Sequence, residues 1–333
     1  MPQDRRLFIH IGLHKTGSTA IQHALNGSMY HLARAGWHYP SCGRHPQTHI
    51  AHDLLRMAYL DLGAGEPFPP AIPIERATIV DALKHEIRIA NLANIILSAE
   101  TLWALDQRAV ESLLADFAEF NPFPVIFIRN MADFCDAVIG TILSMDGYHA
   151  RNVDVADHVR RCETIDFMAL GRRWQAASPS GHVMVQDYDS LGGDGSVSAF
   201  FNMTGLAKAL GWVPREEKAN VSESVLVSYL RLHAGDDRFS QYALASLIER
   251  LRHVDIAQRF TFVDQETRLR MRKKYIAALR GLRDAEFVQF HGNVPQARRR
   301  LQSQAKTYIG SLDDAVAIAE RLLADAPDGV ART

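Results

Sequence analysis

Four short apolar runs constrain the fold of this chain more than any other feature of its sequence. The runs are rich in Ile, Val and Phe, and helical patterns lie between them. Continuous apolar runs are typical of parallel strands that are covered on both faces. Strands that alternate with helices predict an α/β fold with a doubly wound sheet, in which ligands bind at the carboxyl ends of the strands. The runs are LFIHIGL (7–13), NIILSAE (94–100), PVIFIRN (124–130) and HVMVQDY (182–188).

The segment after the first run combines glycines, a lysine and several hydroxyl residues. It reads GLHKTGST over residues 12–19, and an apolar helical stripe follows it. A strand, a tight loop and a helix bring backbone N–H groups and the positive end of the helix to one point, where phosphate-like anions bind. An ATP-binding loop places lysine directly after its second glycine, whereas here Lys15 precedes Gly17 by two residues. This order favours transfer of an anionic group without a metal ion.

The length of 333 residues allows one large α/β domain, or a domain with a helical annex. From about residue 196 onward the pattern is helical and almost no strand signal remains. We therefore expect an α/β core over residues 1–214 and a helical extension over residues 215–333. The net charge of −1 gives the chain no overall attraction for nucleic acid or membranes.

Cysteine content and hydropathy indicate the compartment. The chain has only three cysteines, Cys42, Cys135 and Cys162, and no C-x-x-C pair, which argues against a disulfide framework. No run approaches the roughly 18 apolar residues that a membrane span needs. The first apolar run is predicted to be a strand and not a signal peptide. We expect a cytoplasmic protein.

One segment of the second half is strongly basic. Residues 268–306 hold eleven Arg or Lys against two acids, Asp284 and Glu286, a local net charge of +9. A solvated helix face explains such a segment, and so does a landing surface for an anionic acceptor or a partner subunit. The sequence leaves both explanations open.

Several motifs, in order, resemble those of sulfotransferases that use 3′-phosphoadenosine 5′-phosphosulfate (PAPS). The segment GLHKTGSTAIQ (12–22) is similar to their 5′-phosphosulfate loop, in the variant of bacterial, carbohydrate-type members. PVIFIRN resembles the strand whose arginine, here Arg129, grips the 3′-phosphate of PAPS. The resemblance covers about residues 7–210, and its further matches are GWHYP (36–40), ILSAE (96–100) and LGRRWQAAS…HVMVQDYDSL (170–191).

The resemblance implies a P-loop NTPase-like parallel sheet flanked by helices, with a helical C-terminal extension. It also implies metal-free, in-line transfer of a sulfuryl group from PAPS to a hydroxyl of a carbohydrate or glycolipid acceptor. The product that remains is the desulfated 3′,5′-bisphosphate of the nucleotide, PAP. Lys15 is then a catalytic residue that stabilises charge developing on the leaving phosphate. The expected PAPS-binding residues are His14, Lys15, Thr16, Gly17, Ser18, Thr19 and Arg129.

The acceptor hydroxyl must lose a proton as it attacks sulfur, so the site needs a general base. Glu100 ends the second apolar run, on the expected side of the sheet. His49 and His52 lie in the segment that in similar enzymes faces the acceptor, and a histidine suits proton removal at neutral pH. The sequence leaves the choice among these three residues open.

One position departs from the family pattern. Eight residues after the arginine, where the family usually has a serine that binds the 3′-phosphate, this chain has Ala137. The missing hydrogen bond costs about 1.5–3 kcal/mol of binding free energy if nothing replaces it.

Two other functions stay open. One is a P-loop kinase-type phosphotransferase, because both kinds of enzyme cradle phosphates, and the other is a non-catalytic PAP-binding protein, because of Ala137. The expected partner is a small-molecule or glycan acceptor and not nucleic acid, and a homodimer stays an option.

Overall fold

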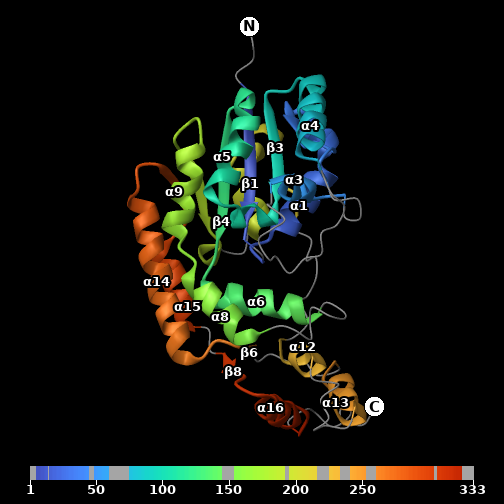
Figure 1. The fold of residues 1–333 in the computed structure, drawn as a ribbon, viewed down its shortest axis with the longest axis vertical. Helices are drawn as coiled ribbons and strands as arrows, with labels where there is room; N and C mark the ends of the chain where they lie inside the picture. Colours follow the sequence, from blue (N-terminus) through green and yellow to red (C-terminus); the bar gives the residue numbers. More distant parts are fainter. Residues whose placement is uncertain are drawn as a thin grey trace. The chain divides into compact units, whose positions relative to one another are not determined.

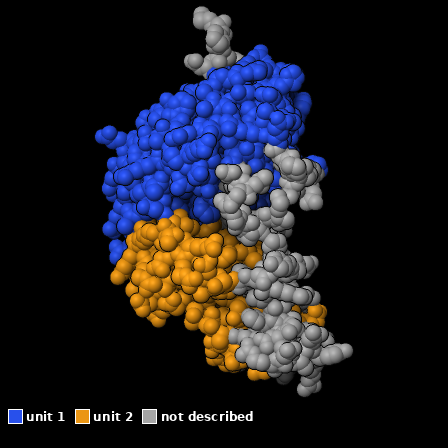
Figure 2. Space-filling model, in the orientation of Figure 1, with its two compact units in different colours: residues 1–129, 166–219, 276–300 blue, residues 130–165, 220–275, 301–333 orange. Residues whose placement is uncertain are grey.

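The computed structural model describes residues 5–13, 15–44, 49–59, 75–144, 154–191, 195–215, 225–232, 241–252, 260–303 and 306–324. The chain divides into two compact units, shown in Figure 2. Unit 1 comprises residues 1–129, 166–219 and 276–300, and unit 2 comprises residues 130–165, 220–275 and 301–333.

Unit 1 is built around a six-stranded parallel sheet with the strand order β2-β3-β1-β4-β5-β7 (Figure 1). The strand order reverses at β1, which pairs with β3 on one side and with β4 on the other. Four of the strands coincide with the predicted apolar runs, so the predicted α/β fold is confirmed. The strands are β1 (Arg6–Gly12), β2 (Trp37–His38), β3 (Asn94–Ala99), β4 (Pro122–Ile128), β5 (Val183–Asp187) and β7 (Val288–His291).

Strand β1 shows why a continuous apolar run forms a central strand. Leu7, Ile9 and Ile11 are fully buried, and the residues between them, which point to the other face, are buried as well. Ile9 lies beside Leu97 of β3 and Pro124 of β4 in the register of the sheet. Because helices cover both faces, neither face of β1 needs polar residues for solvent.

The helices of unit 1 connect the strands and cover the sheet. Helix α1 buries Ile21 and Leu25 in an apolar core that also contains Phe127 and Phe200. The predicted helical stripe is interrupted at Ser28, which separates α1 from α2. The helices are α1 (Ser18–Gly27), α2 (Met29–Arg34), α3 (Asp53–Tyr59), α4 (Arg76–Ala90), α5 (Gln107–Asp116), α9 (Phe167–Ala177), α10 (Gly195–Met203) and α11 (Leu206–Leu210), with the short 3₁₀ helices η1 (Glu100–Ala104), η2 (Ala118–Phe120) and η3 (Tyr188–Ser190).

Unit 2 is mainly helical and contains a two-stranded parallel sheet of β6 and β8. Helices α14 (Gln265–Asp284) and α15 (Val294–Ser303) each have residues in both units. The other elements of unit 2 are α6 (Met131–Ser144), α8 (Val155–Thr164), α12 (Val225–Leu232), α13 (Gln241–Arg252), α16 (Leu312–Ala324), β6 (Phe260–Thr261) and β8 (Thr307–Tyr308).

A buried group of charges ties the elements of unit 2 together. Asp133 and Asp136 of α6 are almost fully buried, and both bind Arg268 of α14 and Lys306 beside β8. Asp136 also accepts hydrogen bonds from the hydroxyl of Thr261 at 2.9 Å and from a backbone N–H of the same segment. Two carboxylates facing two cations leave this interior without net charge, which buried charges require.

Part of the basic segment 268–306 is therefore internal. Arg268 and Lys306 serve the buried group of charges, and Arg270 and Lys274 bind the carboxylate and the carbonyl oxygen of Glu163. Arg283 and Arg300 also have intramolecular partners, the carboxylate of Asp284 and the carbonyl oxygen of Leu191. The structure thus gives at least six of the segment's eleven cations intramolecular partners, a reason for the local charge that the sequence did not suggest.

The second half of the chain differs from its predicted pattern. Strand β7 joins the main sheet beside β5, although almost no strand signal was expected beyond residue 196. As an edge strand, β7 is only half-buried and has no continuous apolar run, which is why the sequence pattern does not reveal it. The compact units also do not follow the division predicted at residues 214 and 215, because residues 276–300 belong to unit 1 and residues 130–165 to unit 2.

Among the helices in the described part of the chain, none is long and apolar enough to cross a membrane.

Candidate functional site

The candidate site lies in unit 1, at the carboxyl ends of the three central strands. Gly12 ends β1, Glu100 directly follows β3, and Arg129 directly follows β4. The strand order reverses here, and ligands of open α/β sheets bind at such a switch point. The sheet thus brings residues that are more than a hundred positions apart to one edge.

The loop after β1 turns tightly on the carbonyl oxygen of Leu13. Thr16 donates both its backbone N–H and its hydroxyl to that oxygen, at 3.3 Å and 2.7 Å. Lys15 and Gly17 have positive φ angles of 63° and 83°, so the backbone passes twice through the left-handed region. The turn leaves the Lys15 side chain exposed and Thr16 fully buried.

Two glycines allow other segments to approach this loop closely. A Cβ atom on Gly12 would lie 1.9 Å from Ser18 Oγ, and one on Gly17 would lie 2.0 Å from Ser196 Oγ. Ser196, near the start of α10, donates a hydrogen bond to the carbonyl oxygen of Gly17 at 3.4 Å. Gly17 is therefore required by space, since its Cβ would also lie 2.4 Å from Ser196 Cβ, and by its backbone conformation. An alanine at Gly12 would force the Ser18 hydroxyl to rotate away.

Lys15, Glu100 and Arg129 meet around the loop. The backbone N–H of Lys15 donates to Glu100 Oε1 at 3.3 Å, and Arg129 Nη1 donates to the Lys15 carbonyl oxygen at 2.7 Å. The Arg129 guanidinium also lies over the ring of Tyr188 from η3, 5.2 Å from its centroid. The structure thus brings together the predicted catalytic lysine, one of the predicted bases and the predicted phosphate-binding arginine.

The start of α1 faces this point with open donors. Gly17 is its N-cap residue and supplies no side-chain cap, so the first-turn N–H groups and the positive end of the helix dipole stay available to an anion. Within the described part of the chain, the buried atoms Ser18 Oγ and Arg129 Nε have no hydrogen-bond partner. Thr19, which follows Ser18 in the chain, is half-buried. This arrangement of donors and cations suits a phosphate or sulfate group.

The three histidines named from the sequence have different positions. His52 is fully buried, its Nδ1 accepts from the Ser98 N–H at 3.1 Å, and its Nε2 donates to the Pro40 carbonyl at 3.0 Å. Burial lowers the pKa of His52 to about 3. His49 is exposed, and its carbonyl oxygen accepts from Arg44 Nη1 at 3.0 Å. His14 lies outside the described residues. His52 therefore holds its segment against β3 and has no ring nitrogen left for an acceptor.

A buried polar cluster under the loop was not found from the sequence. His10 Nδ1 lies 2.8 Å from Ser98 Oγ, which also accepts from Gln22 Nε2 at 3.1 Å. Burial lowers the pKa of His10 to about 4, and the nearby Glu100 opposes this shift. The cluster joins β1, β3 and α1 below the site. The one feature of the sequence that could have indicated this cluster is His10, a polar residue inside an apolar run.

Tyr188 and Ser196 were also missed, because both follow β5 and only the tertiary structure places them beside the loop. Ala137, at the position where the resemblance leads us to expect a serine, lies in α6, and its methyl group offers no hydrogen-bond donor.

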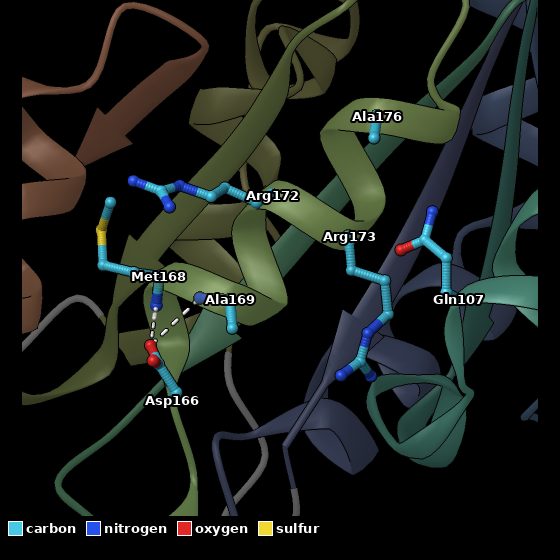
Figure 3. A pocket seen from close by; sticks show the side chains of 7 residues that line it. All are labelled: Gln107, Asp166, Met168, Ala169, Arg172, Arg173 and Ala176. Atoms are coloured by element: carbon cyan, nitrogen blue, oxygen red, sulfur yellow. Dashed lines mark hydrogen bonds between the residues drawn. The ribbon is translucent and has the colours of Figure 1, made fainter.

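A separate depression of about 580 Å³ lies between α5 and α9. Figure 3 shows the side chains that line it. Two of its charged side chains already have partners. Asp166 caps α9 by accepting from the N–H groups of Met168 and Ala169, and Arg173 Nη1 donates to the Leu105 carbonyl at 2.7 Å. We place the candidate site at the loop, because the chemically distinctive residues meet there. The residues that line the depression between α5 and α9 are Gln107, Asp166, Met168, Ala169, Arg172, Arg173 and Ala176.

Within the described ranges, no group of three or more His, Cys, Asp or Glu is placed to hold a metal ion. No protein-family model matches the chain, and no curated protein matches it.

The loop glycines give a first prediction. Gly17→Ala should lower the free energy of unfolding by about 1–3 kcal/mol, because the new methyl group needs a left-handed φ and overlaps Ser196. Gly27→Ala, at the other end of α1, is the matched control. Nothing lies within 4 Å of its Cβ position, so it should stabilise by about 0.4–1 kcal/mol. Urea unfolding measures both. Equal stability of Gly17→Ala and wild type would contradict this account of the loop.

The buried histidines predict a pH dependence of stability. The folded-state pKa values of about 4 for His10 and about 3 for His52 lie below the unfolded value of 6.5. The unfolded chain therefore binds more protons below pH 6.5. The free energy of unfolding therefore keeps its full value above pH 6.5 as far as these two rings are concerned. It decreases as the pH falls toward their folded-state pKa values, by up to about 1.4 kcal/mol per pH unit for each ring.

Urea unfolding between pH 7 and pH 5 tests this expectation. His52→Gln should reduce the slope of unfolding free energy against pH, whereas His23→Gln, at an exposed position of α1, should leave it unchanged. The same slope in His52→Gln and wild type would mean that the ring of His52 is not buried in its neutral form.

Proposed function

We propose that the protein is a PAPS-dependent sulfotransferase that moves a sulfuryl group to a hydroxyl of an acceptor, a carbohydrate or a glycolipid. One observation carries the proposal. Lys15, Glu100 and Arg129 meet at the uncapped start of α1, at the switch point of the sheet. A cation for the leaving group, a carboxylate for the proton and an arginine for a phosphate are the groups that this reaction needs.

The residues of the site fit a nucleotide that carries an anionic group at each end. The first-turn N–H groups of α1 and the Lys15 ammonium would hold the 5′ end, and the buried, unpartnered Ser18 hydroxyl adds a further donor among the described residues. Arg129 would hold the 3′-phosphate, since its Nη1 bond to Lys15 leaves other N–H groups of the guanidinium for this purpose. Thr16 shapes the loop instead of donating to the ligand, because Leu13 takes both of its donors.

When bound, PAPS supplies a sulfuryl group attached to a phosphate leaving group. Lys15 would stabilise the negative charge that develops on that phosphate, and this gain exists only in the transition state. Glu100 would accept the proton of the acceptor hydroxyl, because its carboxylate lies at the loop beside Lys15. His52 is a poor choice, since its ring is buried and both ring nitrogens are hydrogen-bonded. His49 is exposed, and its carbonyl oxygen binds Arg44 instead of a residue of the loop.

A second function, non-catalytic PAP binding, stays open because of one departure from the family pattern. Ala137 replaces the family's serine, so the 3′-phosphate loses one hydrogen bond. A protein that binds PAP without transferring sulfate accommodates such a loss as well as an enzyme does. Assays of turnover distinguish the two functions.

Ligand-induced stabilisation tests the nucleotide. PAP and PAPS should raise the unfolding temperature by several degrees, because a ligand at a hundred times its dissociation constant stabilises the folded state by about 2.7 kcal/mol. ADP and ATP with Mg²⁺ should raise it less, since they lack the 3′-phosphate that Arg129 would bind. Stabilisation by ATP with Mg²⁺ alone would reverse the assignment in favour of a kinase-type phosphotransferase.

Two substitutions separate the roles within the site. Lys15→Ala should slow sulfate transfer about 10²–10³-fold and change PAP affinity much less, because its charge acts mainly in the transition state. Arg129→Ala should weaken PAP binding about 10–150-fold, the equivalent of one charge-assisted hydrogen bond. Arg172→Ala, an exposed arginine of α9, is the matched control and should change neither quantity. Calorimetry with PAP and a sulfate-transfer assay measure them, and mild, equal effects of both site variants would contradict the assigned roles.

A further inference from the structure

Lys15 has an unusual backbone conformation for a lysine. Its φ angle of 63° lies in the left-handed region, where a side chain crowds the backbone and the conformation costs free energy. Asn91 and Asn121 are also left-handed, but they end helices, where asparagine adopts this conformation readily. Lys15 instead lies inside the loop. Such a conformation persists only where surrounding contacts hold it.

Glu100 and Arg129 bind the two polar groups of the Lys15 backbone. The N–H of Lys15 donates to Glu100 Oε1 at 3.3 Å, and its carbonyl oxygen accepts from Arg129 Nη1 at 2.7 Å. Glu100 follows β3 and Arg129 follows β4, and these are the strands that pair with β1 on its two sides. The left-handed residue is thus bonded from both neighbouring strands.

The strand end that carries Glu100 is itself fixed by buried hydrogen bonds. Two residues before Glu100, the Ser98 hydroxyl bonds to His10 Nδ1 of β1 at 2.8 Å and accepts from Gln22 Nε2 of α1 at 3.1 Å. Ser98, His10 and Gln22 are all buried. Because the loop connects β1 to α1, these bonds fix the end of β3 relative to both elements that the loop joins.

We propose that Glu100 is a positioning residue of the loop, a role separate from the acceptance of the acceptor's proton. Its carboxylate accepts the Lys15 N–H and so holds the left-handed backbone in the form that binds an anion. This hydrogen bond is present without a ligand, so the loop is ordered in advance and binding does not have to supply the free energy of ordering it. The effect on nucleotide affinity rests on the proposed function, whereas the effect on the loop does not.

Charge alone predicts the opposite effect of Glu100 on affinity. A carboxylate close to the loop repels the phosphates of PAP, so its removal should strengthen binding if electrostatic repulsion were its main contribution. Loss of the hydrogen bond to Lys15 should weaken binding instead. Glu100→Gln separates the two effects, because glutamine has no charge but retains a carbonyl oxygen that can accept the Lys15 N–H.

The test uses the full chain as wild type, Glu100→Ala, Glu100→Gln and the control Glu111→Ala, which removes a glutamate from an exposed position of α5. Circular dichroism verifies that each variant is folded. Amide hydrogen exchange, measured by mass spectrometry on peptides that contain Lys15, then reports on the loop without a ligand. We expect faster exchange in Glu100→Ala and wild-type exchange in the other two variants. Wild-type exchange in Glu100→Ala, or no recovery in Glu100→Gln, overturns the proposal.

Calorimetry with PAP is the second measurement. Glu100→Ala should weaken PAP binding about 3–10-fold, the equivalent of one hydrogen bond of ordinary strength. Glu100→Gln should bind PAP at least as tightly as wild type, and both Glu100 variants should lose sulfate transfer, since neither has a carboxylate for the proton. Tighter PAP binding by Glu100→Ala contradicts the positioning role. If the wild type binds no PAP, the proposed function fails, and the exchange experiment still decides this inference.

Discussion

The candidate site depends on how closely three chain segments approach one another at the end of β1. Ser18 lies where a Cβ of Gly12 would be, and Ser196 lies where a Cβ of Gly17 would be. Interiors are packed so densely that one additional methyl group would displace the start of α1 or of α10. The absence of two Cβ atoms therefore sets the size of the loop.

The two units use similar charged residues for different purposes. In unit 2, Arg268 and Lys306 face the buried carboxylates of Asp133 and Asp136, and their charges cancel. At the loop, Arg129 is instead fixed by a carbonyl oxygen and by the ring of Tyr188, which leaves its charge uncompensated by these two contacts. A cation that is positioned but not neutralised retains attraction for an anionic ligand. The number of basic residues in a segment therefore says little about binding until their partners are known.

The sequence predicted the parts of the fold that repeat a physical pattern. The four apolar runs became parallel strands because both faces of those strands are buried, and such strands contain no alternation that could be confused with a surface strand. Strand β7 was missed because it lies at the sheet edge, where burial is partial. The buried cluster of His10, Ser98 and Gln22 was missed for another reason, since its members lie on three elements and no local pattern connects them.

The sequence by itself determined four of the strands of the main sheet, their alternation with helices, the glycine and lysine loop after the first strand, and the candidates Lys15, Glu100 and Arg129. These features depend on neighbours along the chain. Only the tertiary structure decided that Glu100 lies beside the loop, that the ring of His52 is used for packing, and that Tyr188 and Ser196 line the same place. The pairing of β1 with β3 and β4 brings distant residues to one edge of the sheet, and such contacts come from strand order, which local patterns do not contain.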